Sequence, residues 1–116
     1  MGRTAEWGRT HYCAAKWGII GFTQALATET GRHGVRVNCV VPGLVHTEVV
    51  EGYMKGVAKE KKVPYEEMYR RFASSHPTNK IVQMSEVAEL MLFLASDRAA
   101  SIHGQSINIS AGYWMT

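Results

Sequence analysis

The sequence predicts an α/β protein in which two strands pair in parallel and are joined by a crossover helix. A helical pattern of apolar residues over 12–30 comes before a short β-branched run at 35–43. A second helical pattern at 84–97 comes before an alternating strand pattern at 104–112. Because parallel strands need a long connection, usually a helix, this order is typical of a right-handed βαβ unit.

The first predicted helix leads directly into the first predicted strand. The larger apolar residues of the helix recur at helical spacing, which predicts a long, well-buried helix: Trp17, Ile19, Ile20, Phe22 and Leu26. Gly31 and Gly34 end this pattern. The run VRVNCVVPG, residues 35–43, is rich in valine and ends at Pro42-Gly43, so we expect an interior strand that is buried on both faces.

A long excursion, residues 44–80, separates the first strand from the second helix. It carries two weaker helical patterns that are divided at Val63-Pro64. Because so long a segment in a compact domain is usually functional, we predict that it forms a substrate lid. The second helix is expected to begin with Ser85 as its N-cap, and Ile107 and Ile109 alternate with polar residues in the last strand.

Composition limits the classes of function. The 116 residues are 46% hydrophobic with a net charge of +3, which indicates one globular unit. The basic run at 59–62 is interpreted as solvated surface, so no nucleic-acid partner is expected. Cys13, Cys39 and the five histidines lack metal-binding spacing, so we expect no metal site. No apolar segment approaches the ~20 residues of a membrane span, and we expect a cytoplasmic protein with no membrane partner.

Tyr12 and Lys16 carry the first chemical signal. Residues four apart on a helix lie on one face, so the phenol and the ammonium reach the same pocket. A free phenol has a pKa of about 10, and a nearby ammonium favours its anionic form. The pair is therefore suited to moving a proton to or from an alcohol oxygen. Taken alone, such a pair is common on helix surfaces.

Four motifs in a fixed order give the pair its context. They are YCAAKWGIIGF from Tyr12, GVRVNCVVPGLVHT from Gly34, FLASD from Phe93 and GQSINISAG from Gly104. Together they closely resemble the second half of the short-chain dehydrogenase/reductase family, from about residue 2 to the C-terminus. The resemblance implies that Tyr12 is the general acid/base. It also implies that Lys16 binds the ribose of a nicotinamide cofactor and assists the tyrosine.

The segment PGLVHT, residues 42–47, is similar to the PGxxxT motif of that family. The resemblance implies that Pro42 and Gly43 let the chain pass close to the nicotinamide ring. It further implies that the backbone of Val45 and the hydroxyl of Thr47 meet the carboxamide or the phosphates. Outside this pattern Pro-Gly would be only a turn. The cofactor is NAD or NADP, and the sequence does not choose between them.

The resemblance also implies a doubly wound, Rossmann-like parallel sheet of seven strands. Residues 1–116 would form a partial, C-terminal domain with the last two strands, the flanking helices and a helical lid at 44–80, without the first five strands. The glycine-rich phosphate turn and the catalytic asparagine and serine would lie upstream. We therefore expect either association with a missing N-terminal half or a homo-oligomer. A truncation, a mis-started gene and a genuine half-domain are all open.

Substrate residues are suggested less directly. Residues 48–116 are most similar to members that act on polyols, sugar phosphates and short 3-hydroxy acids. Arg9 stands where 3-hydroxyacid members carry a lysine that holds the substrate carboxylate, with a solvated arginine as the alternative. Tyr53 stands where those members have a lid glutamine. The expected partner is a small-molecule alcohol or ketone: a polyol, a sugar or a short hydroxy acid.

Two functions follow from the sequence. The first is an NAD(P)-dependent oxidoreductase that transfers hydride between nicotinamide and an alcohol or ketone, with Tyr12 as general acid/base. In that case the 116-residue chain alone is expected to be inactive. The second is a non-catalytic interaction or oligomerisation fragment that binds no cofactor.

Overall fold

The elements follow one another in the predicted order. The computed structural model describes residues 5 and 7–115. Its helices are α1 (Thr10–Thr30), α2 (Glu48–Lys61), α3 (Tyr65–Ala73) and α4 (Met84–Ala95), with short 3-10 turns at Gly31–His33 and Asp97–Ala99. Its strands are β1 (Cys39–Pro42), β2 (Val45–His46), β3 (Val82–Gln83) and β4 (Ser106–Ile109). The two-residue strands β2 and β3 were not predicted.

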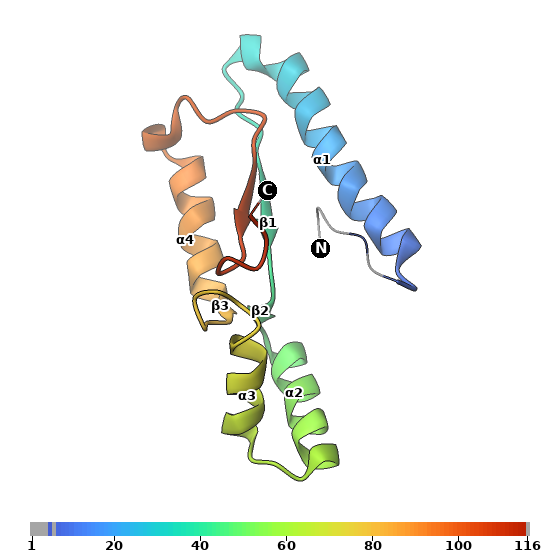
Figure 1. Cartoon of the computed structure of the whole chain (residues 1–116). Coiled ribbons are helices and arrows are strands. Elements are labelled where there is room, and N and C mark those ends of the chain that lie inside the picture. Colours follow the sequence, from blue (N-terminus) through green and yellow to red (C-terminus); the bar gives the residue numbers. More distant parts are fainter. Residues whose placement is uncertain (1–4, 6, 116) are drawn as a thin grey trace.

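Strands β1 and β4 form the centre of the molecule. They pair in parallel, with Val41 opposite Asn108, which confirms the predicted pairing. Helix α1 lies on one side of this ribbon and α4 on the other, while α2 and α3 extend from its end as a hairpin (Figure 1). Strands β2 and β3 also pair in parallel, through Val45 and Val82, and tie the start of the hairpin to its end.

The first strand begins four residues later than predicted, so the prediction is wrong over residues 35–38. Hydrogen bonds to side chains, rather than a regular β-ladder, hold much of this segment. The N–H of Val37 donates to Nδ1 of His103 at 3.2 Å. The Asn38 amide donates to the Ile102 carbonyl at 2.8 Å and accepts from the N–H of Gln105 at 3.1 Å. Asn38 therefore supports the entry to β1 and the entry to β4 together.

The prediction that α1 is well buried is also wrong for this chain. Among the described residues, the helix buries only Ile20, Thr23 and Ala27. Trp17 is 51% exposed and Phe22 is 64% exposed. A ribbon of two strands about 4.8 Å apart is narrower than a helix of about 10 Å diameter. The ribbon therefore covers only one stripe of α1.

Helix α4 begins at Met84, with Gln83 in place of Ser85 as its N-cap. The backbone at Gln83 is still extended because this residue ends β3. The Glu86 carboxylate accepts a hydrogen bond of 2.7 Å from the N–H of Gln83, as in a capping box. Ser85 therefore lies one residue inside the helix, where its hydroxyl is not the cap.

The α2–α3 hairpin has the most completely buried core of the described chain. Met54, Met68 and Ile81 are at most 2% exposed. Within the predicted lid segment, the following apolar and aromatic side chains pack against this cluster: Val50, Val57, Tyr65, Tyr69 and Phe72. These side chains therefore stabilise the hairpin itself.

The molecule is more open than a self-sufficient domain of its size. Its radius of gyration is 16.8 Å and its dimensions are 57 × 32 × 23 Å. A compact chain of this length would have a radius of gyration of about 13 Å. Its accessible surface of 7919 Å² exceeds the roughly 6,300 Å² expected from its mass. The chain is therefore more extended than a compact domain of its mass.

Candidate active site

Tyr12 lies in the first turn of α1 between two cationic side chains. The Lys16 ammonium nitrogen is 5.4 Å from the centroid of the Tyr12 ring, and the Arg9 guanidinium carbon is 6.0 Å from it. Both distances are within the range of cation–π attraction. The structure therefore brings Arg9, Tyr12 and Lys16 together, as the spacing on one helix face requires.

A cavity of about 260 Å³ separates this helix face from the first strand. Tyr12, Lys16, Ile19 and Ile20 line it from α1, and Cys39 to Gly43 line it from β1 and the turn that follows. Pro42 and Gly43 thus share a cavity with Tyr12 and Lys16, although about thirty residues separate them in the sequence. This juxtaposition joins two of the predicted motifs in one place.

Gly43 is required by a close contact between β1 and β4. Its N–H donates to the Ile109 carbonyl at 2.9 Å. A Cβ at this position would stand 2.9 Å from both Cα and Cβ of Ser110, closer than real side chains approach. Gly43 is therefore more than a turn residue, because it lets the end of β4 lie against the end of β1.

Pro42 is tolerated because of the direction in which it faces. The backbone N–H groups of Cys39 and Gly43 both donate to β4 or its entry. Since peptide groups alternate direction along a strand, the position of Pro42 faces away from β4, where the described chain has no partner strand. The missing N–H of proline therefore removes no bond between these two strands.

Val45 and Thr47 follow on the next stretch of backbone. Leu44 accepts a bond of 3.1 Å from the N–H of Val82, so the backbone groups of Val45 point away from β3. Thr47 is the N-cap of α2, and its hydroxyl accepts a bond of 3.3 Å from the N–H of Val50. A hydroxyl that accepts in this way still has its own hydrogen to donate.

A larger cavity, of about 510 Å³, opens on the other side of Tyr12, and we call it the tyrosine cavity. Its lining comes from the start of the chain, the turn after β1, the end of α3 and the C-terminal tail: Ala5, Tyr12, Pro42, Gly43, Leu44, Phe72, Ser75, His76, Tyr113 and Trp114. Three of these are large aromatic side chains from segments far from Tyr12 in the sequence. The cavity therefore offers room for a small organic molecule beside the phenol.

Tyr53 does not line either cavity that contains Tyr12. It lies on α2, 63% exposed, and its ring contacts that of Phe72 edge-on at 6.1 Å. Phe72 does line the tyrosine cavity, so Tyr53 lies directly behind the wall of the cavity. Arg9 is not among the residues that line these two cavities either, but its guanidinium carbon lies 6.0 Å from the centroid of the Tyr12 ring.

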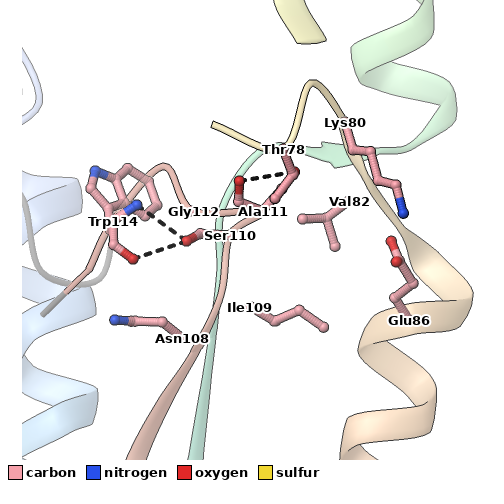
Figure 2. Close-up of a pocket in the computed structure, with 10 residues that line it drawn as sticks. All are labelled: Thr78, Lys80, Val82, Glu86, Asn108, Ile109, Ser110, Ala111, Gly112 and Trp114. Atoms are coloured by element: carbon pink, nitrogen blue, oxygen red, sulfur yellow. Dashed lines mark hydrogen bonds between the residues drawn. The ribbon is translucent and has the colours of Figure 1, made fainter. Parts of the chain in front are cut away.

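The C-terminal tail is fastened to the loop before β3. Figure 2 shows the Ser110 hydroxyl meeting the backbone of Trp114 and the Thr78 hydroxyl meeting the Ala111 carbonyl, at 3.2 and 3.0 Å. A Cβ on Gly112 would stand 3.2 Å from the Pro77 ring. These contacts place Tyr113 and Trp114 at the tyrosine cavity. Their position could not be predicted from the sequence, since no periodic pattern extends past β4.

His46 links the backbone of the PGLVHT segment to the hairpin. Its Nε2 lies 3.1 Å from the Tyr65 hydroxyl, and its ring meets that of Tyr69 edge-on at 5.5 Å. Burial raises the pKa of the Tyr65 hydroxyl above its usual value, and the negative charge of Glu51 adds to the effect. Glu51 in turn pairs with Lys55 at 2.6 Å, which lowers the pKa of its carboxyl.

Two other kinds of site are not found in the described part of the chain. Residues 5 and 7–115 contain no group of three or more histidine, cysteine or acidic side chains that could hold a metal ion. No helix formed by those residues combines the length and the apolarity that crossing a membrane requires. Within the same described residues, neither Cys13 nor Cys39 forms a disulfide.

The family model described as enoyl-(acyl carrier protein) reductase matches residues 1–114. The chain belongs to the short-chain dehydrogenase/reductase family. The match confirms the resemblance carried by the four motifs. The parallel α/β architecture agrees with a C-terminal portion of that family's fold.

Individual relatives support the same assignment. The 3-oxoacyl-[acyl-carrier-protein] reductase FabG of Haemophilus influenzae is 32% identical over 116 residues, which are 100% of this chain and 43% of that protein. L-Sorbose reductase of Gluconobacter frateurii, solved with NADPH and L-sorbose, superposes with a TM-score of 0.90 at 27% identity, covering 99% of this chain and 44% of its own. A 4-hydroxyisoleucine dehydrogenase complexed with NADH gives a TM-score of 0.80 at 28% identity, covering 97% and 42%. The chain thus spans about two-fifths of the length of these proteins.

Proposed function

We propose that this protein belongs to a nicotinamide-dependent oxidoreductase that interconverts an alcohol and a ketone, with Tyr12 as the general acid/base. The observation that carries the proposal is the meeting of Tyr12 and Lys16 with Pro42 and Gly43 around one cavity. A second cavity, beside the same phenol, has the size for a small substrate. Phenol, ammonium and substrate space are therefore adjacent.

Tyr12 moves the proton in this proposal. In the reducing direction its hydroxyl gives a proton to the carbonyl oxygen as that oxygen becomes negative, and in the oxidising direction the phenolate takes the proton from the alcohol. Lys16, 5.4 Å from the ring centroid, stabilises the negative charge that the phenol oxygen carries in between. Arg9 adds a second positive charge at 6.0 Å. Proton transfer of this kind contributes a rate factor of about 10² to 10⁴.

The residues present fit a nicotinamide. The backbone N–H and C=O of Val45 point away from β3 and suit a carboxamide, which both donates and accepts hydrogen bonds. Thr47 retains a hydrogen to donate, and the Lys16 ammonium can donate to ribose hydroxyls. When bound, nicotinamide supplies or accepts the hydride. The relatives solved with NADPH and with NADH leave both cofactors as candidates.

Arg9 would anchor a substrate only where that substrate carries a carboxylate. Its guanidinium lies beside the phenol and can hold a carboxylate through two parallel hydrogen bonds. Tyr53 acts indirectly, through Phe72, because its ring contacts Phe72 and does not itself line the cavity. Residues 44–80 then serve as a lid that keeps water from the reacting atoms.

Cofactor binding tests the proposal. Purified chain is heated with and without NADH and NADPH, and the melting temperature is followed by tryptophan fluorescence. Binding to the folded state stabilises it by about 2.7 kcal/mol at a cofactor concentration 100 times Kd. Lys16→Met should weaken the shift, Tyr12→Phe should keep it, and Lys59→Met on the exposed face of α2 is the matched control. A melting temperature that neither cofactor changes would contradict the proposal for this chain.

The second candidate is a non-catalytic fragment that associates through its apolar surface and binds no cofactor. Trp17, Phe22 and Leu92 are all more than half exposed. Strand β1 has no partner opposite β4 in the described chain, and the groove along that edge, about 510 Å³, is lined from both α1 and α4. This surface suits another copy of the chain or the remainder of a larger enzyme, since an open strand edge is a template for pairing. Sedimentation with and without cofactor separates the two candidates.

A further inference from the structure

His76 is a buried side chain in the wall of the tyrosine cavity that the proposed chemistry does not use. It follows α3, is 2% exposed, and lines the cavity together with Tyr12. Its ring packs on that of Tyr113 with centroids 4.9 Å apart. A histidine so deeply buried normally has hydrogen-bond partners for both ring nitrogens.

The contacts of Nδ1 fix which nitrogen carries the proton. Nδ1 lies 3.1 Å from the Phe72 carbonyl and 3.2 Å from the Ser75 hydroxyl. The Ser75 hydroxyl donates its one hydrogen to the Phe72 carbonyl at 2.7 Å, so only its lone pairs are left for Nδ1. Both neighbours of Nδ1 are therefore acceptors, and Nδ1 must be the N–H of the neutral ring.

Nε2 is left as a hydrogen-bond acceptor without a donor. It is closed to solvent, and none of the described residues gives it a hydrogen bond. A buried acceptor left unpaired costs about 1–3 kcal/mol relative to a paired one. Because Nδ1 is directed at the end of α3, Nε2 lies on the opposite edge of the ring, away from α3.

We propose that His76 determines substrate specificity by accepting a hydrogen bond at Nε2 from a substrate hydroxyl other than the reacting one. The inference rests on the proposed function, and it narrows the substrate class to polyhydroxylated ketones and alcohols. Tyr12 and His76 both line the tyrosine cavity, so a ligand that fills this cavity contacts both side chains. A simple ketone has no hydrogen to give Nε2, whereas a ketose or polyol has several.

The rest of the wall suits the same class of molecule. Phe72, Tyr113 and Trp114 present aromatic rings, and Tyr113 and Trp114 meet edge-on at 5.0 Å. The C–H groups of a polyol pack against aromatic faces while its hydroxyls keep polar partners. Tyr113 is 47% exposed and packs on the His76 ring at a tilt of 41°. In the proposed complex its ring turns aside so that a substrate hydroxyl reaches Nε2.

Two substitutions at residue 76 separate a ligand role from a structural one. His76→Asn keeps a donor near the position of Nδ1 for the Phe72 carbonyl but removes the acceptor at Nε2. His76→Gln keeps an acceptor near the position of Nε2, because its longer side chain reaches that position, but it removes the donor at Nδ1. We measure KM for L-sorbose and for hexan-2-one, a six-carbon ketone without hydroxyls, with NADPH and the oxidoreductase to which the chain belongs. His76→Asn should raise KM for L-sorbose about tenfold and leave KM for hexan-2-one unchanged. With His76→Gln, KM for L-sorbose should stay close to that of the unaltered protein.

A binding measurement makes the inference independent of turnover. The imidazole nitrogens of His76 are observed by ¹⁵N NMR while D-sorbitol is added to the full chain without cofactor. A hydrogen bond accepted at Nε2 should move the Nε2 resonance and leave Nδ1 nearly unchanged. An unmoved Nε2, or equal effects of Asn and Gln on both ketones, would overturn the role of His76. Absence of hydride transfer by the unaltered protein would overturn the proposed function alone, since the NMR titration still decides the role of His76.

Discussion

Arg36 clamps the end of α4 to the segment that leads into β1, and its removal should destabilise the whole described fold. Its guanidinium donates to the carbonyls of Leu94, Ser96 and Ala99 at 2.7, 3.0 and 3.0 Å. These carbonyls lie at the C-terminus of α4 and in the turn that follows, where helical partners run out. One planar cation thus joins two elements: it supplies the Leu94 carbonyl and adds a second donor to the carbonyls of Ser96 and Ala99, which also accept from the N–H groups of Ala99 and Ile102.

The size of the effect follows from these three bonds. A hydrogen bond to a charged group contributes about 1.5–3 kcal/mol, and bonds that share one donor group are not additive. Water can reach carbonyls that are only partly buried, which reduces the loss. We therefore expect Arg36→Met to lower the free energy of unfolding by about 2–4 kcal/mol. A compact chain of this length has a total of roughly 6–17 kcal/mol, so the change is large.

Urea unfolding followed by circular dichroism measures the effect. Arg98→Met is the matched control, because Arg98 is an exposed arginine whose guanidinium carbon lies 5.7 Å from the Phe93 ring centroid. It should cost less than about 1 kcal/mol. Arg36→Lys should recover only part of the loss, since an ammonium cannot reproduce the planar fork. Equal midpoints for Arg36→Met and Arg98→Met would refute the clamp.

Two further perturbations test the packing and the electrostatics. Gly43→Ala should destabilise the chain by about 1–3 kcal/mol, because its Cβ would stand 2.9 Å from the Cα of Ser110. Gly52→Ala is the control: its Cβ would have no neighbour within 4 Å, so it should stabilise α2 by up to about 1 kcal/mol. Thermal melting of the two variants should move in opposite directions, and equal shifts would contradict the close contact. Because burial raises the pKa of the Tyr65 hydroxyl, the folded chain holds that proton more tightly than the unfolded chain. The stability that this group contributes is full below a pH of about 10 and is lost as the pH rises through the raised pKa. The urea midpoint of the unaltered protein should therefore fall between about pH 9 and about pH 11, and that of Tyr65→Phe should fall less over the same range. A fall of equal steepness in both proteins would contradict the assigned cause.

The sequence predicted those features that depend on neighbours along the chain. Tyr12 and Lys16 share a face because helical geometry alone places residues four apart together. The order of elements and the parallel pairing of β1 with β4 also followed, since a helical crossover leaves few other topologies. The meeting of this pair with Pro42 and Gly43 required the family resemblance, because no local rule connects them.

Other features depend on atoms that a sequence pattern does not represent. The apolar pattern of α1 predicted burial, but burial needs a surface to cover Trp17 and Phe22, and two strands are too narrow to provide it. Ser85 had the chemistry of an N-cap, but the chain is still extended at Gln83 and the helix begins directly after it. His76 approaches the tyrosine cavity only because α3 ends there, so its position emerges from the folded hairpin.

Transfer of deuterium from labelled cofactor to substrate tests whether Tyr12 is the general acid/base of a hydride transfer. NADPH and NADH carrying deuterium at the transferable C4 position are incubated with L-sorbose and the protein, and the product is analysed by mass spectrometry. In the oxidoreductase to which the chain belongs, deuterium should appear on the product carbon, and Tyr12→Phe should slow the transfer by about 10² to 10⁴ while cofactor binding is kept. Transfer at the same rate with Tyr12→Phe would contradict the role of Tyr12 as the general acid/base.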